Sequence, residues 1–174
     1  MKALLIVDIQ NDFVKPTGTL YSNGVEGIIP NILSLVEMFK KEGVPIITTM
    51  DWHKVHDPEF EKWPPHCVEK TEGAALIMEL DDSLKNYEKH YTIKKRKYSA
   101  FFDTNFEGLL KSLNIEEIHV VGVATNICVL FTVEELCNRE YKVVVHEKGT
   151  ASYDEKLHRF ALREMKEVLG VEIL

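Results

Sequence analysis

Short apolar runs alternate with longer segments of helical periodicity along this chain. Six runs rich in β-branched residues predict strands. Most of these runs are almost wholly apolar, which is typical of strands covered on both faces in a parallel sheet. The expected strands span residues 3–8, 45–51, 88–93, 117–123, 142–147 and 172–174.

Four segments between these strands repeat apolar residues every three or four positions, as an amphipathic helix does. Gly43 and Gly170 stand just beyond two of them, at the left-handed position that often ends a helix. The expected helices span residues 25–41, 105–113, 126–139 and 154–169. The alternation of strand and helix predicts a three-layer α/β/α sandwich, in one domain that covers residues 1–174.

One irregular region, residues 52–86, interrupts this alternation. Long irregular segments in compact domains are often functional. Ligands of open α/β sheets bind beyond the carboxyl ends of the strands. Asp8, Asp51, Lys95 and Cys128 all lie at or just after the end of a predicted strand. We therefore expect four separate strand ends to converge on one crevice.

Composition narrows the classes of function. A net charge of −7 over 174 residues argues against a general nucleic-acid binder. No apolar stretch approaches the roughly 20 residues needed to cross a bilayer, and the N-terminal apolar run reaches Asp8 too soon for a signal peptide. The three cysteines form no CxxC pattern, which fits a reducing compartment. We expect a cytoplasmic protein, monomeric or homo-oligomeric, with a small-molecule substrate and no nucleic-acid or membrane partner.

Asp51 and His53 form the first half of a candidate metal site. Residues i and i+2 of a strand point to the same face, so this carboxylate and this imidazole would lie side by side, as ligands of Zn²⁺ do. Glu59 and His66 lie on the following loop, which could fold back and complete the set, with His56 as a competing ligand. The alternative is that Asp51 and His53 only cap the strand end.

Cys128 is the candidate nucleophile. We expect it in the first turn of a helix that follows a strand, where free N–H groups and the helix dipole favour a thiolate and can hold an oxyanion. The alternative is a buried structural cysteine. That is our interpretation of Cys137, and Cys67 is a loop residue to which we assign no role.

Asp8 and Lys95 are the candidate partners of this thiol. A carboxylate that ends a buried apolar strand must be paired, hydrogen-bonded or protonated. A lysine directed into the crevice would pair with it and stabilise developing negative charge. The alternatives are that Asp8 caps a turn and that Lys95 belongs to a solvated basic loop at residues 94–97.

Five motifs carry a resemblance to a known family. They are LIVDIQNDF at 5–13, DWH at 51–53, WPPH at 63–66, KRKYSAF at 95–101 and GVATNICV at 122–129. In this order, and over nearly the whole chain, they resemble the motifs of the isochorismatase-like cysteine hydrolases and, among these, of the nicotinamidases.

The resemblance implies an isochorismatase-like, Rossmann-like fold with a six-stranded parallel sheet. It also implies a catalytic triad of Asp8, Lys95 and Cys128, although a one-residue shift to Lys94 stays open. The backbone N–H groups of Ala124 and Cys128 would form the oxyanion hole. A cis peptide bond is expected immediately before Ala124.

The resemblance further implies one divalent metal ion, with Zn²⁺ expected and Fe²⁺ or Mn²⁺ as alternatives. Its ligands would be Asp51, His53, Glu59 and His66, with Glu59 bound either directly or through water. The aromatic rings of Phe13 and Trp63 would contact a flat substrate, together with Val123, although either ring would also suit a purely structural role.

The implied reaction is the conversion of nicotinamide, and also of pyrazinamide, to the corresponding acid and ammonia, in pyridine nucleotide salvage. Two alternatives stay open. The first is another hydrolase of the superfamily that acts on a non-pyridine amide. The second is a non-catalytic ligand-binding module that keeps the fold, which the presence of all three triad residues disfavours.

Overall fold

A six-stranded parallel sheet runs through the middle of the computed structural model, which describes residues 1–174. The strand order is β3-β2-β1-β4-β5-β6. The strands are β1 (Lys2–Val7), β2 (Ile46–Asp51), β3 (His90–Lys95), β4 (Glu117–Val123), β5 (Lys142–Ala151) and β6 (Glu172–Ile173). Each overlaps a predicted strand, and the expected α/β class with a six-stranded parallel sheet is confirmed.

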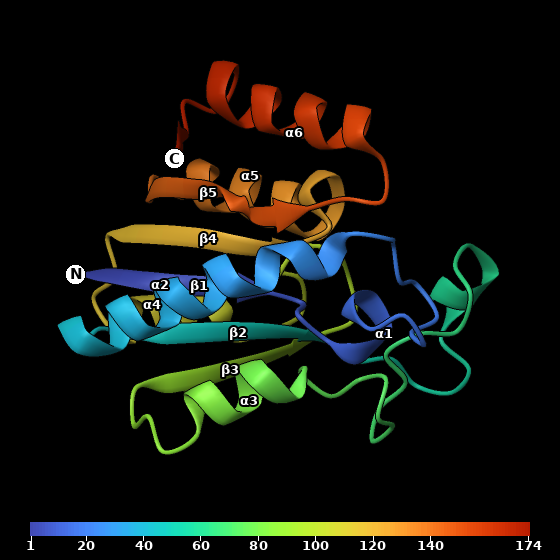
Figure 1. Ribbon diagram of the computed structural model, residues 1–174. Helices are drawn as coiled ribbons and strands as arrows, with labels where there is room; N and C mark the ends of the chain where they lie inside the picture. Colours follow the sequence, from blue (N-terminus) through green and yellow to red (C-terminus); the bar gives the residue numbers. More distant parts are fainter.

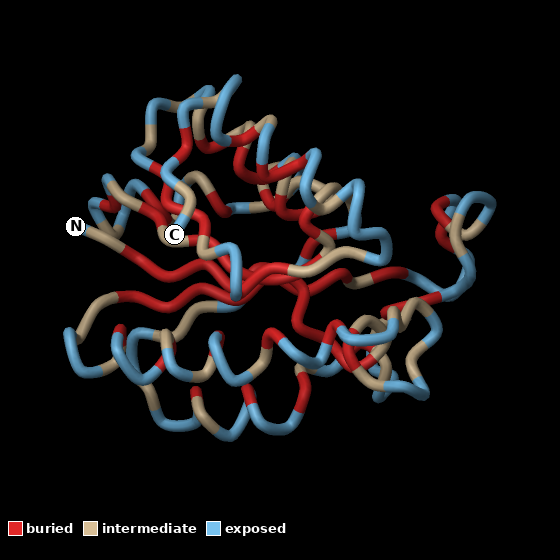
Figure 2. Tube along the Cα trace, turned by 45° about the horizontal axis from the view of Figure 1, so that its top comes forward, coloured by how far each residue is buried: buried red, intermediate tan, exposed pale blue.

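Helices cover both faces of the sheet, so the predicted three layers are present (Figure 1, Figure 2). One face carries α2 (Ile29–Glu42) and α3 (Met78–Leu84). The other carries α4 (Phe106–Ser112), α5 (Leu130–Asn138) and α6 (Glu155–Glu167). The short helix α1 (Asn11–Val14) follows β1 almost directly. No helix combines the length and the apolar character needed to span a membrane.

Two apolar cores, one on each face of the sheet, explain why the strands are so apolar. In β1, Leu4 and Ile6 belong to the core under α2 and α3, whereas Ala3, Leu5 and Val7 belong to the core under α4, α5 and α6. All of these side chains are fully buried. Alternate residues of a strand point to opposite faces, so a strand covered on both faces is apolar throughout.

The strand order places the carboxyl end of β1 at the centre of one edge of the molecule. β1 pairs with β2 on one side and with β4 on the other. Where the strand order reverses in this way, a crevice opens beyond the carboxyl ends of the strands. Figure 1 shows the irregular segment, coloured teal to green, extending beyond this same edge.

Gly122 allows β4 to approach β1 closely at this edge. Its φ of 124° lies in a region that residues with a side chain rarely adopt, and an added Cβ would lie 2.1 Å from the carbonyl oxygen of Val7. Glycine permits both the backbone angle and the close approach. The end of β4 is thereby held against the end of β1, next to Asp8.

Four elements differ from the predictions. Helix α3 lies inside the region predicted to be irregular, because a seven-residue helix is too short to show a clear periodicity. The predicted helices 25–41 and 126–139 begin with other turns, a 3₁₀ turn at Val25–Ile28 and a π-helical turn at Thr125–Val129. Strand β5 continues to Ala151 beyond a register shift in its pairing with β4, so its far end does not follow the apolar pattern.

Candidate active site and metal centre

Four strand ends contribute side chains to one buried cluster, as predicted. Asp8 follows β1, Asp51 ends β2, Lys95 ends β3, and Cys128 lies in the π-helical turn after β4. The pairing of β2 with β3 places Asp51 directly beside Lys95. All four residues are buried, with exposed fractions of 6% or less. Residues far apart in the sequence therefore meet at the predicted edge.

The ammonium group of Lys95 lies at the centre of this cluster. Its Nζ is 2.7 Å from Asp8 Oδ2 and 2.5 Å from Asp51 Oδ1. The same Nζ lies 3.5 Å from the Sγ of Cys128. Lys94, in contrast, is exposed and places its Nζ 3.7 Å from the centre of the Trp52 ring. The geometry thus favours Lys95 over Lys94 as the lysine that partners Asp8 and Cys128.

Burial and ion pairing act in opposite directions on this lysine and on Asp51. Burial alone would lower the pKa of Lys95, but the carboxylates of Asp51 and Asp8 raise that pKa well above its ordinary value. Burial alone would raise the pKa of Asp51, but Lys95 and the two histidines beside Asp51 bring that pKa well below its ordinary value. The site therefore holds an ammonium ion and at least one carboxylate away from water.

Burial has the largest effect on the pKa values of Cys128 and Asp8. It raises the pKa of the Cys128 thiol well above its ordinary value, although the nearby Lys95 acts in the opposite direction. Burial also raises the pKa of Asp8, with a further contribution from the charge of Asp51. The prediction that the helix start would favour a thiolate is therefore wrong, because the thiol is buried in a π-helical turn and needs a base to remove its proton.

The Asp8 carboxylate is fixed by its own backbone and by β2. Its φ of 52° lies in the left-handed region, which Asp tolerates better than most residues. The hydroxyl of Thr49 donates a hydrogen bond of 2.6 Å to Asp8 Oδ1. The other oxygen of Asp8 faces Lys95. A carboxylate, an ammonium group and a thiol held together in this way can carry nucleophilic attack on a carbonyl carbon.

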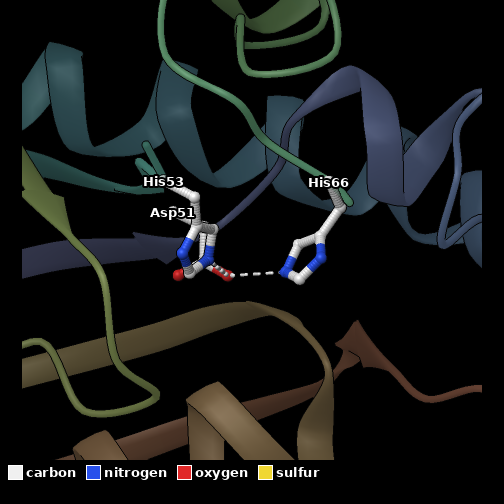
Figure 3. A group of neighbouring side chains, drawn as sticks. All are labelled: Asp51, His53 and His66. Carbon is white, nitrogen blue, oxygen red and sulfur yellow. Dashed lines mark ion pairs between the residues drawn. The ribbon is translucent and has the colours of Figure 1, made fainter. Parts of the chain in front are cut away.

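A second group of side chains adjoins the first through Asp51. One ligand atom each from Asp51, His53 and His66 lies within 4.8 Å of the others, and all three residues are buried. The Nε2 atoms of both histidines are 3.7 Å from Asp51 Oδ2. Figure 3 shows His66 reaching toward Asp51 and His53 from a separate segment of the chain.

The residues present fit a divalent metal ion. Nε2 of His53 is buried and has no hydrogen-bond partner, which is costly unless another group binds it. Two imidazole nitrogens and one carboxylate oxygen form a donor set that suits Zn²⁺, with a position left open for water or substrate. Asp51 belongs both to the cluster around Lys95 and to the candidate metal group, because its Oδ1 faces Lys95 and its Oδ2 faces the histidines.

Glu59 lies outside this group of three. Its carboxylate accepts hydrogen bonds of 2.6 Å from Lys97 and 2.7 Å from the hydroxyl of Tyr98. Glu59 also lines the cavity beside the histidines, so it stays a predicted ligand, either directly or through water. His56, the competing ligand from the sequence, is exposed and is not part of the group.

A cavity of about 250 Å³ opens onto both groups. Cys128 and Ala124, the two residues expected to form an oxyanion hole, lie in its wall. The three residues expected to contact substrate, Phe13, Trp63 and Val123, also line it. The peptide bond before Ala124 is cis, as the resemblance implied.

Sequence reasoning missed several residues that hold the site together. Gln10 is fully buried, and its side chain both donates to the carbonyl of Asp51 and accepts from the N–H of Asp51, each at 2.8 Å. Tyr98 accepts a hydrogen bond of 3.2 Å from the Trp63 indole. Asp57 lies 3.1 Å from His53. Gln10 and Tyr98 lie within the motifs at 5–13 and 95–101. Their hydrogen-bond partners, like that of Asp57, depend on how the chain folds.

A model of the isochorismatase domain matches residues 2–173. The chain belongs to the isochorismatase family. The match covers every side chain described above, from Asp8 to Cys128. The turn that carries Cys128 and the group of Asp51, His53 and His66 thus both lie within the matched residues.

Relatives in this family resemble the chain over nearly its full length. An uncharacterized isochorismatase family protein of Bacillus subtilis is 34% identical, over 99% of this chain and 98% of the relative. The crystal structure of a Bacillus subtilis nicotinamidase/pyrazinamidase has a TM-score of 0.94 at 32% identity, over 99% of this chain and 98% of that one. The crystal structure of a Pyrococcus horikoshii pyrazinamidase in complex with zinc has a TM-score of 0.90 at 30% identity, with the same two coverages.

We predict that a double His53→Ala, His66→Ala variant loses its bound divalent metal, because it removes both imidazole ligands. Metal content after dialysis, measured by elemental analysis on the purified proteins, checks this. A His56→Ala variant is the matched control and should keep the metal content of the unaltered protein. Full occupancy in the double variant would place the metal elsewhere.

Proposed function

We propose that this protein is a metal-dependent cysteine amidohydrolase that converts nicotinamide to nicotinate and ammonia, and that it also acts on pyrazinamide. One observation carries the proposal. A buried thiol–carboxylate–ammonium cluster adjoins a carboxylate–histidine group, and the thiol-bearing Cys128 lines one cavity together with the carboxylate–histidine group. The names of the similar structures, a nicotinamidase/pyrazinamidase and a zinc-bound pyrazinamidase, support the same assignment. The product would enter pyridine nucleotide salvage.

In the first step, Asp8 accepts the thiol proton of Cys128, and the thiolate attacks the carboxamide carbon. The raised pKa of Asp8 suits it to hold that proton. Lys95, at 3.5 Å from the sulfur, stabilises the negative charge that develops there. The carbonyl oxygen becomes an oxyanion, which accepts hydrogen bonds from the N–H groups of Ala124 and Cys128.

In the second step, Asp8 returns its proton to the amide nitrogen, the carbon–nitrogen bond breaks, and ammonia leaves. The substrate is then a thioester of Cys128. Asp8 next takes a proton from water, and the resulting hydroxide attacks the thioester carbon. The carbon–sulfur bond breaks, the acid is released, and the thiolate recovers its proton from Asp8.

The metal ion would be held by Asp51, His53 and His66. When bound, it offers a coordination position for a ring nitrogen of the substrate. Phe13 and Trp63 supply aromatic surface for a flat ring within the same cavity. These contacts would orient the carboxamide over the sulfur of Cys128, and such orientation lowers the barrier of a bimolecular step.

A family hydrolase that acts on a non-pyridine amide is the second candidate. It would share the Asp8–Lys95–Cys128 cluster but would have no need for a metal ion that binds a ring nitrogen. The buried Nε2 of His53, without a hydrogen-bond partner, favours the metal-dependent candidate.

We predict that Cys128→Ala lowers kcat for ammonia release from nicotinamide by at least about a thousandfold, because the nucleophile is lost. Cys137→Ala is the matched control. Its thiol lies in α5, away from the cluster, so it should change stability more than kcat. Substantial ammonia release by the Cys128→Ala variant would contradict the assignment of the nucleophile.

We predict that kcat/KM falls steeply when the ring nitrogen is removed or moved. Nicotinamide and pyrazinamide carry a nitrogen meta to the carboxamide and should both react. Benzamide has no ring nitrogen, so it should react at least about a hundredfold more slowly. Picolinamide, with its nitrogen ortho to the carboxamide, should fail because the geometry is wrong. Equal values for benzamide and nicotinamide would favour the second candidate instead.

A further inference from the structure

Asp57 is a buried carboxylate that faces the side of His53 turned away from the candidate metal position. Its Oδ2 lies 3.1 Å from Nδ1 of His53, and its side chain is 3% exposed. The other ring nitrogen, Nε2, points toward Oδ2 of Asp51. The imidazole of His53 therefore lies between two carboxylates, of which only Asp51 belongs to the group of three.

The other histidine of the group has the same arrangement. Nε2 of His66 points toward Asp51, and its Nδ1 lies 2.7 Å from the backbone carbonyl of Pro64. A carbonyl oxygen can only accept, so Nδ1 of His66 carries the hydrogen and Nε2 carries the free lone pair. In both rings, Nδ1 thus faces an oxygen acceptor, and Nε2 faces the same point beside Asp51 Oδ2, which is the candidate metal position.

Histidines that bind metal ions commonly donate the hydrogen of their second ring nitrogen to a carboxylate or a carbonyl, which fixes the tautomer and makes the ligand more basic. In His53 the contact to Asp57 is close, but it is not aligned as a hydrogen bond. A hydrogen bond from Nδ1–H to Asp57 would complete in His53 the pattern that His66 shows.

Asp57 also organises the loop that carries Glu59. Its Oδ1 accepts a hydrogen bond of 2.9 Å from the N–H of Glu59 and caps the 3₁₀ turn Pro58–Glu61. One oxygen of Asp57 therefore serves the loop and the other faces the imidazole. Capping alone needs only one oxygen and would be served equally well by Asn.

We propose that Asp57 is a positioning residue for the metal site, which holds Nδ1–H of His53 so that Nε2 is free to bind the ion. This inference rests on the metal site of the proposed function. It goes beyond that function because it assigns the tightness of metal binding to a residue that is not itself a ligand. It also links metal binding to the loop that carries Glu59.

Metal affinity of the whole protein, measured by competition with a chelating dye for Zn²⁺, tests the proposal. Asp57→Ala removes the cap, the charge and the acceptor, whereas Asp57→Asn can keep the cap with its one oxygen but then turns an amide NH2, a donor, toward Nδ1 of His53. Each variant should weaken Zn²⁺ binding by about tenfold to a hundredfold. The melting temperature of metal-free Asp57→Asn should equal that of the unaltered protein. Glu61→Gln, which removes an exposed charge from the same turn, should leave the affinity unchanged.

The proposal is overturned if Asp57→Asn and Asp57→Ala bind Zn²⁺ as tightly as the unaltered protein. Lower melting temperatures with unchanged Zn²⁺ affinity would mean that Asp57 only caps the turn. The proposal is also overturned if the unaltered protein binds no Zn²⁺. Ammonia release from nicotinamide is measured separately. A protein that binds Zn²⁺ through Asp57-dependent histidines but releases no ammonia would contradict the proposed function and leave this inference standing.

Discussion

The buried ammonium group of Lys95 is the charge on which the rest of the site depends. It is fully removed from water and lies within 2.7 Å of an oxygen of Asp8 and within 2.5 Å of an oxygen of Asp51. Two carboxylates buried this close together cannot both stay ionised without a compensating cation. The three charges come from the ends of three different strands, so the parallel sheet is the scaffold that makes this arrangement possible.

Asp51 connects this ion-paired cluster to the candidate metal site. One of its oxygens faces Lys95, and the other faces both histidines. Its backbone is held by the fully buried side chain of Gln10. A change in metal binding would therefore change the charge environment of Lys95. Through Lys95 it would also affect Asp8 and the thiol of Cys128. In the proposed function this shared carboxylate fixes the position of a metal-bound ring relative to the nucleophile.

The sequence was sufficient to predict the sheet, its layers and the meeting of Asp8, Asp51, Lys95 and Cys128, because strand ends of a parallel sheet converge for geometric reasons. It was not sufficient for the loop, because the partners of Glu59 and Asp57 depend on a chain path that no periodicity encodes. It also misjudged the thiol of Cys128. Helix position suggested a lowered pKa, but burial in a π-helical turn outweighs that effect and raises the pKa.

The most direct test of the central role of Lys95 is kcat/KM for nicotinamide in Lys95→Gln and Lys94→Gln, each corrected for the folded fraction. The two lysines are neighbours in β3, but Lys94 is exposed beside Trp52. If the buried ammonium group stabilises Asp8, Asp51 and the reacting sulfur, Lys95→Gln should lose at least about a hundredfold in kcat/KM, and Lys94→Gln should match the unaltered protein. Equal kcat/KM values for folded Lys95→Gln and the unaltered protein would contradict the account.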